Sequence, residues 1–393
     1  MGPSEPPEDS IVAKVMFFGV LAVLLIILGG CAYFLYGYLF PPSDSPDITT
    51  PVPSPTVVIT PTPVITPTPT PLPYDWLTVS PTAEPTEVPP VVDYQYDTRI
   101  TDEVKIVMPP GIWGRYVVYD ERVSENNYKV HLYDVKSLSD TVIASGNVRS
   151  YGAIGQGKVA LLDLGDSSIK LYDIDRKSSE TITPSKQFPR AFPSIFDDYV
   201  IYTGDEGGTN EVLGRIHIFS LYAHRMSDGI DSMWAVDIAE PHEPRGEGNY
   251  LVWWTIDGTK KEIILHDIKS GKSQTISTDN CDHPRISDGV VVYHNGADHH
   301  IYLYDIASGQ TRKIVAIGRQ YSADISGSRI VYDDNRAGNW DIYMFDLSTG
   351  KETQITNEPH DQMSPQIYGD TIIYMDNRNS PTGNWDIYTI KVS

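Results

Sequence analysis

Cysteine is nearly absent from this chain: Cys31 and Cys281 are the only two among 393 residues. Cys31 lies in an apolar run near the N-terminus, whereas Cys281 lies in the part that we expect to fold, so no disulfide can form within a domain. A domain of this size buries enough apolar surface to be stable without crosslinks. The scarcity of cysteine therefore excludes a small disulfide-stapled fold and does not exclude a location outside the cytoplasm.

Basic residues are also few, with 30 Lys and Arg against 52 Asp and Glu and a formal net charge of −22. Phosphate recognition requires a basic surface, so we expect no nucleic acid partner. The sequence has no Asn-X-Ser/Thr acceptor with X other than Pro, which argues against N-glycosylation. It also has no Gly-x-Ser-x-Gly nucleophile elbow, which argues against a serine hydrolase site.

What the chain does contain is a repeat. Two segments match without a gap at a constant separation of 255 positions. The first copy has Thr98, Ile100, Met108, Pro110, Ile112, Gly114 and Tyr119, and the second has Thr353, Ile355, Met363, Pro365, Ile367, Gly369 and Tyr374. Between them an apolar triplet recurs. The seven triplets are Val117–Tyr119, Ala160–Leu162, Val200–Tyr202, Leu251–Trp253, Val291–Tyr293, Ile330–Tyr332 and Ile372–Tyr374.

A second strand follows each triplet, and several of these strands end in an aromatic–Asp pair such as Tyr304-Asp305. A turn with Gly comes next, as at Gly309 and Gly350, where a hairpin requires a positive φ. Clusters about 42 residues apart are typical of four-stranded propeller blades. We therefore predict an all-β, seven-bladed β-propeller, with a stacked β-solenoid as the alternative.

The last repeat lacks its outer strand, and the segment Tyr96–Thr101 has the sequence of that strand. Pairing the two would close the ring and cover two sheet edges that otherwise promote aggregation. A solenoid would not need a split repeat. The propeller is thus predicted to span residues 93–393 and to be closed by an N-terminal outer strand.

Ahead of the propeller, residues 15–40 carry no charge and are mostly apolar, with several Tyr near their end. About 20 such residues cross a bilayer, and Tyr prefers the interface. We predict a transmembrane helix or signal anchor here, after a short tail at 1–14. Leu28–Cys31 resembles a lipobox, so lipidation of Cys31 is the alternative, although Ala32–Phe40 remains apolar.

Residues 41–92 hold more than half of the chain's 30 prolines, alternating with Thr. Such a segment adopts extended polyproline II and does not fold by itself. It is typical of O-glycosylated stalks. We predict a disordered Pro/Thr-rich stalk on a single-pass protein of the cell membrane, with the propeller extracytoplasmic. Lys14 alone gives only weak information on orientation.

The last two repeats carry a longer signature, Asp334-Asn-Arg336…Asn339-Trp-Asp-Ile-Tyr343 and Asp376-Asn-Arg378…Asn384-Trp-Asp-Ile-Tyr388. With it, residues 96–393 resemble TolB-like, WD-repeat-like β-propellers, and among them the surface-exposed propellers of methanogenic archaea. The resemblance implies a propeller at an archaeal envelope. The extra α/β domain of TolB has no counterpart here, so a Tol–Pal role is not implied.

Loops that join an outer strand to the next inner strand converge on one mouth of a propeller channel. The polar candidates there are Arg190, His242, Glu243, Asp282, His283, Tyr321, His360, Asp361 and Gln362. Imidazole and carboxylate suit a divalent metal, which makes His242, His283 and His360 candidate ligands. The resemblance adds that some TolB-like propellers are pectin-fragment lyases with a metal held by His and Gln. No close His-x-His spacing is present, and a solvated polar mouth is the alternative.

Two other arrangements have a functional and a structural interpretation. Cys281 beside His283 could act as a nucleophile, but nothing marks an oxyanion hole. The Asp-Asn-Arg…Asn-Trp-Asp segments could bind Ca²⁺ or present Trp340 and Trp385 to a sugar. Alternatively, Asp and Asn satisfy turn backbone, Arg pairs with Asp, and Trp packs. Because the segment recurs in consecutive repeats, we favour the structural interpretation and expect no cofactor, with Ca²⁺ or another divalent metal as the alternative.

These observations favour a membrane-anchored binding or scaffolding module at the cell surface, with a protein or glycan partner and no catalysis. The alternative is a metal-assisted polysaccharide lyase or hydrolase acting at the channel mouth. A third hypothesis is a structural role in a surface layer.

Overall fold

The computed structural model describes residues 97–101, 109–183, 190–205, 208–210, 214–216, 219–238, 241–257, 260–315, 317–379 and 384–392. These residues belong to one compact unit. The predicted tail (1–14), membrane span (15–40) and stalk (41–92) lie outside the described residues. Within the described ranges, no helix is long and apolar enough to cross a membrane.

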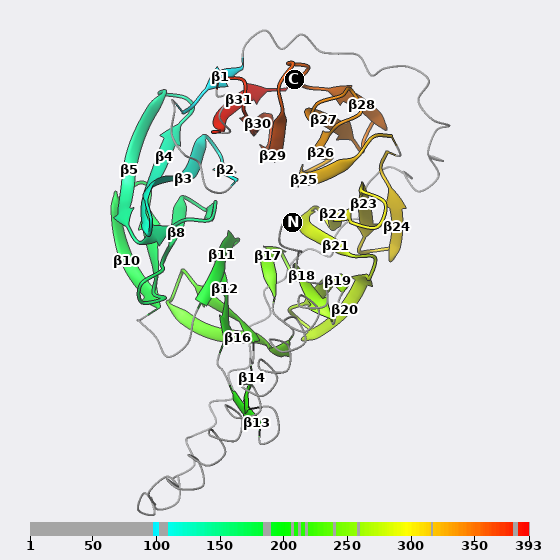
Figure 1. The fold of residues 1–393 in the computed structure, drawn as a ribbon. Coiled ribbons are helices and arrows are strands. Elements are labelled where there is room, and N and C mark those ends of the chain that lie inside the picture. Colours follow the sequence, from blue (N-terminus) through cyan, green and yellow to red (C-terminus); the bar gives the residue numbers. More distant parts are fainter. Residues whose placement is uncertain are drawn as a thin grey trace, which may run out of the picture. The chain divides into compact units, whose positions relative to one another are not determined.

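Seven antiparallel sheets stand around a central axis as the blades of a propeller (Figure 1). Blade 1 consists of β2 (Gly111–Trp113), β3 (Tyr116–Ser124), β4 (Asn127–Asp134) and β5 (Ser139–Gly146). Blade 2 consists of β6 (Val148–Arg149), β7 (Ile154–Gly155), β8 (Lys158–Asp163), β9 (Ile169–Asp173) and β10 (Ser178–Thr183). Blade 3 consists of β11 (Arg190–Phe196), β12 (Tyr199–Asp205), β15 (Phe219–Arg225) and β16 (Ile230–Ile238).

Blade 4 consists of β17 (His242–Glu247), β18 (Tyr250–Asp257), β19 (Lys260–Asp267) and β20 (Lys272–Ser277). Blade 5 consists of β21 (Cys281–Ser287), β22 (Val290–Asn295), β23 (His300–Asp305) and β24 (Gln310–Lys313). Blade 6 consists of β25 (Gln320–Ser326), β26 (Arg329–Asp334), β27 (Asp341–Asp346) and β28 (Lys351–Gln354). Blade 7 consists of β29 (Gln362–Tyr368), β30 (Thr371–Asp376), β31 (Asp386–Lys391) and β1 (Thr98–Arg99).

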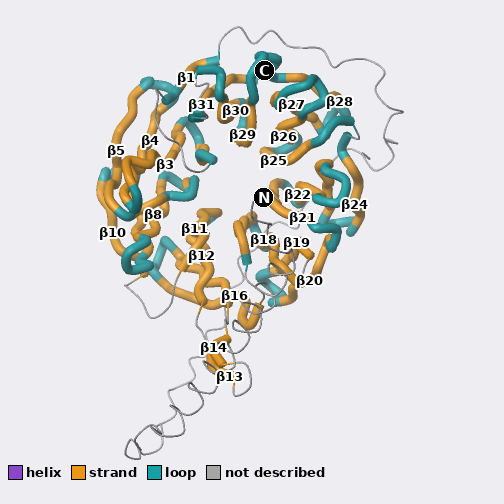
Figure 2. The backbone as a smooth tube through the Cα atoms, viewed as in Figure 1, coloured by secondary structure: helices purple, strands orange, loops and turns teal. Residues whose placement is uncertain are grey.

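The first strand of each blade lies nearest the centre of the ring and the last strand lies at its rim (Figures 1 and 2). A small separate hairpin, β13 (Gly208–Asn210) with β14 (Gly214–Ile216), extends from blade 3 between β12 and β15. The predicted all-β, seven-bladed architecture is thus confirmed, and the stacked solenoid is wrong.

The core lies between the blades, and the apolar triplets build it. Successive residues of a strand point to opposite faces. In β26, Ile330 and Tyr332 therefore pack with blade 5, whereas Val331 packs with blade 7. Similar clusters join each neighbouring pair of blades around the ring, and the triplet side chains in them are almost completely buried.

The N-terminal strand closes the ring as predicted. β1 pairs antiparallel with β31, with Thr98 opposite Thr389 and Arg99 opposite Tyr388. The Arg99 guanidinium lies 2.8 Å from a carboxylate oxygen of Asp386, and the Thr101 hydroxyl donates to the same carboxylate at 3.1 Å. Blade 7 is therefore assembled from both ends of the propeller sequence.

Candidate functional site

The inner strands of several blades share an unusual backbone geometry near their first residues. Phe192, Glu243, His283 and Ser364 each precede a proline and have φ between 48° and 54°. The strand register shifts at the same places. Positive φ is uncommon for residues other than glycine and costs on the order of 1 kcal/mol or more. Because this strain recurs at the same position of several inner strands, we treat these four residues and their equivalents in the other blades as a candidate site.

Aligning the repeats on this position gives one triplet per blade, which we call the mouth triplets. Their first residues are Pro109, Tyr151, Phe192, Glu243, His283, Ser322 and Ser364. Their third residues are Gly111, Ala153, Ser194, Arg245, Arg285, Asp324 and Gln366. All seven first residues line one cavity of about 200 Å³, the mouth cavity, at the end of the channel where the inner strands begin. The repeat therefore builds a ring of side chains around the channel mouth.

A second cavity of about 230 Å³, the inner cavity, lies farther along the channel. Tyr151, Arg245, Arg285 and Gln366 border both cavities. Glu243 and His283 border the mouth cavity and are not among the residues that line the inner one. The two arginines thus lie at the junction of the cavities, one layer below the first ring.

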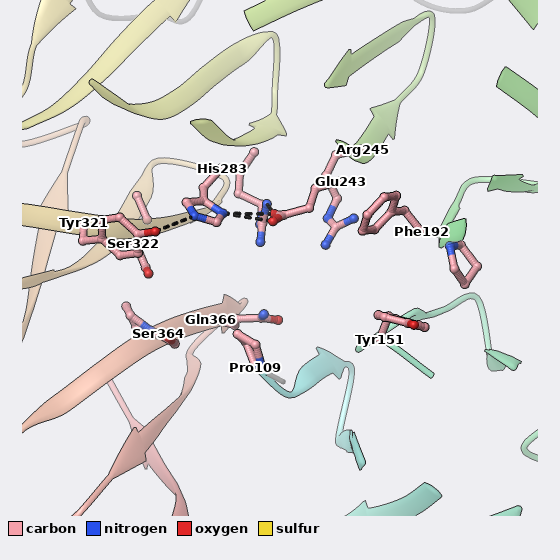
Figure 3. A pocket seen from close by; sticks show the side chains of 14 residues that line it. Pro109, Tyr151, Phe192, Glu243, Arg245, His283, Tyr321, Ser322, Ser364 and Gln366 are labelled. Carbon is pink, nitrogen blue, oxygen red and sulfur yellow. Dashed lines mark hydrogen bonds and ion pairs between the residues drawn. The ribbon is translucent and has the colours of Figure 1, made fainter. Parts of the chain in front are cut away.

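The mouth cavity has two chemically different halves (Figure 3). Blades 4 and 5 supply a charged half, which consists of Glu243, Arg245, His283 and Arg285. Blades 1 to 3 supply an apolar half, which consists of Pro109, Tyr151, Phe192 and Pro193. A ligand that fills this cavity must therefore match charge on one side and apolar surface on the other.

Glu243 organises the charged half. His283 Nδ1 donates to its carboxylate at 3.0 Å, and Arg285 Nη1 donates to it at 3.3 Å. His283 Nε2 lies 3.1 Å from the Tyr321 hydroxyl, so Tyr321, His283 and Glu243 form a chain of hydrogen bonds along the rim (Figure 3).

The pKa values of this pair shift in opposite directions. Burial raises the pKa of Glu243, but the hydrogen bond from His283 and the charges of His283 and Arg285 outweigh burial and lower it below its usual range. Burial lowers the pKa of His283, but the hydrogen bond and charge of Glu243 outweigh that effect and raise it. The contact is therefore an ion pair over a wider pH range than two isolated groups would allow.

The two arginines differ in their neighbours. Arg285 interacts with Glu243 and lies 3.9 Å from Asp324. Arg245 donates from Nη1 to the Pro244 carbonyl at 3.0 Å, and no carboxylate of the described residues forms an ion pair with it. Burial and the charge of Arg285 lower the pKa of Arg245 to about 10. Arg245 thus lies beside another cation, and the charges of Glu243 and Asp324 act on it without a direct ion pair.

Three of the predicted site residues, Glu243, His283 and Tyr321, line the mouth cavity. His242 instead stacks on Trp254, with ring centroids 4.0 Å apart. Asp282 is buried and accepts hydrogen bonds from His294 Nδ1 at 2.8 Å and Lys261 Nζ at 2.6 Å. His242 therefore stacks within blade 4, Asp282 joins blade 5 to blade 4, and neither residue lines the mouth cavity.

The predicted loop of blade 7 is also structural. His360 is exposed, and its carbonyl oxygen accepts a hydrogen bond from Gln362 Nε2 at 2.7 Å. Asp361 accepts from the Trp340 backbone at 3.1 Å. Arg190 begins β11, and its side chain lies outside the described residues. The candidate metal ligands His242, His283 and His360 are therefore not brought together, and the described ranges contain no group of three or more His, Cys, Asp or Glu that could hold a metal ion.

Cys281 is completely buried, and its Sγ lies 3.0 Å from the Ser277 hydroxyl. Burial raises the pKa of the thiol to about 11. A nucleophilic cysteine needs its thiolate form, which this environment suppresses at neutral pH. The proximity of Cys281 to His283 in sequence therefore does not create a nucleophile.

In the Asp-Asn-Arg segments, Asp bonds the turn backbone and Arg pairs with Asp, as predicted. Asp334 accepts from the Arg336 backbone at 2.8 Å and pairs with its guanidinium at 2.6 Å. Arg378 repeats both contacts with Asp376 in blade 7. Each arginine also lies 4.3 Å from the centroid of a Tyr ring in the next strand. These contacts fix the loops between the second and third strands.

The predicted set omitted Arg245, Arg285, Tyr151, Phe192 and Ser364, which all line the mouth cavity. The sequence marks four of these five residues by the x-Pro-x pattern of their mouth triplets, whereas Tyr151 stands in a Tyr-Gly-Ala triplet. Aligning the triplets places arginines from adjacent blades in the third position, where the other blades carry Gly, Ala, Ser, Gln and, in blade 6, Asp324.

No protein-family model and no curated protein matches the chain. Solved structures do resemble it. Acylaminoacyl peptidase from Pyrococcus horikoshii matches with a TM-score of 0.54 at 14% identity, over 70% of this chain and 49% of that one. The chain thus spans about half the length of that peptidase.

Two other structures match over almost their whole length. The β-propeller domain of the Trilobed protease from Pyrococcus furiosus, reported with an open velcro topology, has a TM-score of 0.55 at 11% identity over 75% of this chain and 95% of that one. Oligogalacturonate lyase in complex with manganese has a TM-score of 0.53 at 12% identity, over 76% and 93%. At these identities the likeness establishes the propeller fold alone.

Proposed function

We propose that this chain is a binding module whose channel mouth captures a ligand with an anionic group. The observation that carries the proposal is the pair Arg245 and Arg285, of which Arg245 forms no direct ion pair with a carboxylate of the described residues and is influenced by Glu243 and Asp324 only from a greater distance. The protein has a formal net charge of −22, so its overall field repels anions. A local cation pair in such a protein indicates a specific anion site.

The physical chemistry of the pair supports this proposal. A guanidinium presents a planar set of donors that matches a carboxylate or phosphate, and such charge-assisted bonds are strong when they are shielded from water. Burial and then the charge of Arg285 lower the pKa of Arg245, as expected for two neighbouring cations removed from water. A bound anion would offset the repulsion between them.

The proposed setting is the cell surface. The predicted span at residues 15–40 and stalk at 41–92 support a membrane-anchored propeller that is displayed outside the cytoplasm. The resemblance to TolB-like and archaeal surface propellers supports the same location. In this setting the partner is a protein or glycan of the envelope.

The competing proposal is a metal-assisted polysaccharide lyase, for which the likeness to oligogalacturonate lyase in complex with manganese is the motivation. The mouth residues favour binding over this chemistry. His283, which is the candidate ligand at the mouth, is already engaged by Glu243 and Tyr321.

A thermal-shift and calorimetric titration of the full chain tests the binding proposal. The probes are inorganic phosphate, trigalacturonate and a pentapeptide with a free C-terminus. A ligand at one hundred times its Kd stabilises the folded state by about 2.7 kcal/mol, so at least one probe should raise the unfolding midpoint.

Arg245→Gln should abolish that shift, and Arg176→Gln should retain it, because the Arg176 side chain is 79% exposed on the rim of blade 2. The proposal fails if no probe binds, or if Arg245→Gln binds as tightly as the unaltered protein.

A further inference from the structure

Resting on the proposed function, we infer that the anionic group is the C-terminal carboxylate of a polypeptide that ends in an apolar or aromatic residue. The inference comes from three features of the mouth cavity. These are the depth of its cations, the chemistry of the opposite wall, and the polar groups between the two.

The cations lie below the rim. Arg245 and Arg285 occupy the third position of their mouth triplets and border both cavities, whereas Glu243 and His283 occupy the first position. An anionic group that enters from the mouth therefore passes the first ring of side chains before it reaches the guanidinium groups. A carboxylate at the end of an extended chain satisfies this requirement, because no bulky group follows it into the channel.

Small residues leave room at this depth. The third positions of blades 1, 2 and 3 are Gly111, Ala153 and Ser194, of which Ala153 and Ser194 line the inner cavity and leave more room there than Asp324 and Gln366 of blades 6 and 7. Gly111 also tolerates no side chain, because a Cβ built on it would lie 2.0 Å from the Gly152 carbonyl oxygen. Gly111 thus lets blades 1 and 2 approach closely, and the small side chains of Ala153 and Ser194 leave space in the inner cavity.

The apolar half faces a terminal side chain. Tyr151 and Phe192 pack edge to face with ring centroids 6.4 Å apart, and Pro109 and Pro193 extend this wall. Aromatic walls of this kind bury large apolar groups favourably. The volume of the mouth cavity, about 200 Å³, suits a terminal residue and not a bulky folded surface.

Polar groups lie between the two halves. Ser322, Ser364 and Gln366 border the same cavity from blades 6 and 7. Their side chains are suited to the amide N–H and C=O groups that precede a terminal carboxylate, which need partners when they leave water. A peptide end matches all three regions of the cavity at once.

Other anions match the cavity less well. A sugar acid would place several hydroxyl groups along the apolar half, where the Tyr151 hydroxyl is the one side-chain group that can bond them. Free phosphate would leave the apolar half empty. The charge and apolar pattern together favour a carboxylate attached to an apolar body.

The test uses the full chain and the pentapeptide acetyl-Gly-Ser-Gly-Leu-Phe as free acid, as C-terminal amide, and with Ser in place of the last Phe. Isothermal titration calorimetry should show binding of the free acid. The amide should bind at least about tenfold more weakly, because it cannot form the charge-assisted bonds to the arginines. The peptide ending in Ser should also bind more weakly.

Variants assign these effects to the two halves. Arg245→Gln should remove the difference between acid and amide, whereas Phe192→Ala should reduce the preference for Phe over Ser and keep the preference for acid over amide. The acid–amide comparison in the unaltered protein keeps the inference testable even if a variant fails to fold.

Equal binding of acid and amide would overturn the inference. Binding of trigalacturonate or phosphate in place of the peptides, lost in Arg245→Gln, would overturn the inference and leave the proposed function standing. Absence of binding by every anionic probe would overturn both.

Discussion

The contact between His283 and Glu243 depends on pH in a way that its geometry determines. The pKa of His283 lies above its ordinary value of 6.5, so its contribution to stability is complete below pH 6.5 and is lost as pH rises through the folded-state pKa. The pKa of Glu243 lies below its ordinary value of 4.5, so its contribution is present above pH 4.5 and is lost as pH falls through the folded-state pKa. The ion pair therefore stabilises the fold most between pH 4.5 and 6.5.

Replacing His283 with Gln tests this window. We expect the substitution to lower the free energy of unfolding by about 1 kcal/mol more at pH 6 than at pH 8.5. At pH 6 it removes a charged imidazole that pairs with Glu243, whereas at pH 8.5 it removes a neutral one. Urea unfolding at the two pH values measures the difference. His360→Gln is the matched control, since His360 is exposed. An equal loss at both pH values would contradict the ion pair.

Cys281 should be chemically inert in the folded protein. Its side chain is completely buried, and burial raises the pKa of the thiol to about 11, so both access and thiolate are lacking at neutral pH. We expect iodoacetamide at pH 8 to leave Cys281 unmodified in the native state and to modify it fully in urea. Peptide mapping by mass spectrometry distinguishes it from Cys31. Rapid native alkylation would show that the inner strand of blade 5 opens readily.

The candidate site was only partly predictable from single residues. Glu243, His283 and Tyr321 were predicted because polar side chains at the start of an inner strand face the channel mouth in this fold. His242 also lies at the start of an inner strand, but its imidazole ring stacks on Trp254 and does not line the cavity. Arg245 and Arg285 are not found from single residues because they follow a bulge, whose Pro is visible in the sequence only when the triplets of several blades are aligned.

Among the structural elements, the third strands of blades 6 and 7 provide a natural comparison. Asp386 begins β31 and pairs with Arg99 of the closing strand. Asp341 begins β27 at the equivalent place, but the residue that corresponds to Arg99 is Gln354, whose Nε2 lies 3.4 Å from the carboxylate. Burial raises the pKa of Asp341 to about 7. Stability therefore falls as pH rises from 3.8, the ordinary pKa of Asp, to about 7, and is level above that pH.

Replacing Gln354 with Arg should supply the missing counterion. We expect the variant to be about 1 kcal/mol more stable than the unaltered protein at pH 8, with a smaller gain at pH 5, where Asp341 is protonated. Arg99 shows that an arginine fits this position of a blade. Thermal unfolding at both pH values checks the result. Gln310→Arg, on the exposed part of β24, is the control and should give no gain.

The strands themselves were the most predictable elements. The apolar triplets identify the second strand of every blade, since their alternating side chains must pack against two neighbouring blades. The divided inner strand of blade 2, which forms β6 and β7, and the hairpin of β13 and β14 have no such signal. Among the described residues each of these features occurs in one blade only, so comparison of the repeats could not predict them.

At the scale of the whole molecule, the ring has no covalent closure within the described residues. Every blade packs against two neighbours, and the contact between blades 7 and 1 is an apolar cluster that includes Val117, Tyr119 and Ile373. β1 reinforces this junction because its sequence precedes blade 1 and its hydrogen bonds join blade 7. Stability of the junction therefore depends on a strand of two residues and on the Arg99–Asp386 pair.

Replacing Arg99 with Gln should weaken this junction before any other. The side chain of Asp386 is only 5% exposed, and removing the partner of a buried charge costs about 3 kcal/mol. Because blades 3 to 5 keep both of their neighbours, hydrogen exchange should accelerate in β1, β31 and blade 1 while amides of β18 and β22 remain protected. Hydrogen-exchange mass spectrometry measures this pattern, with Arg176→Gln as the control. Uniform acceleration around the ring would show that the blades open as one unit, and unchanged exchange would show that the apolar cluster alone holds the junction closed.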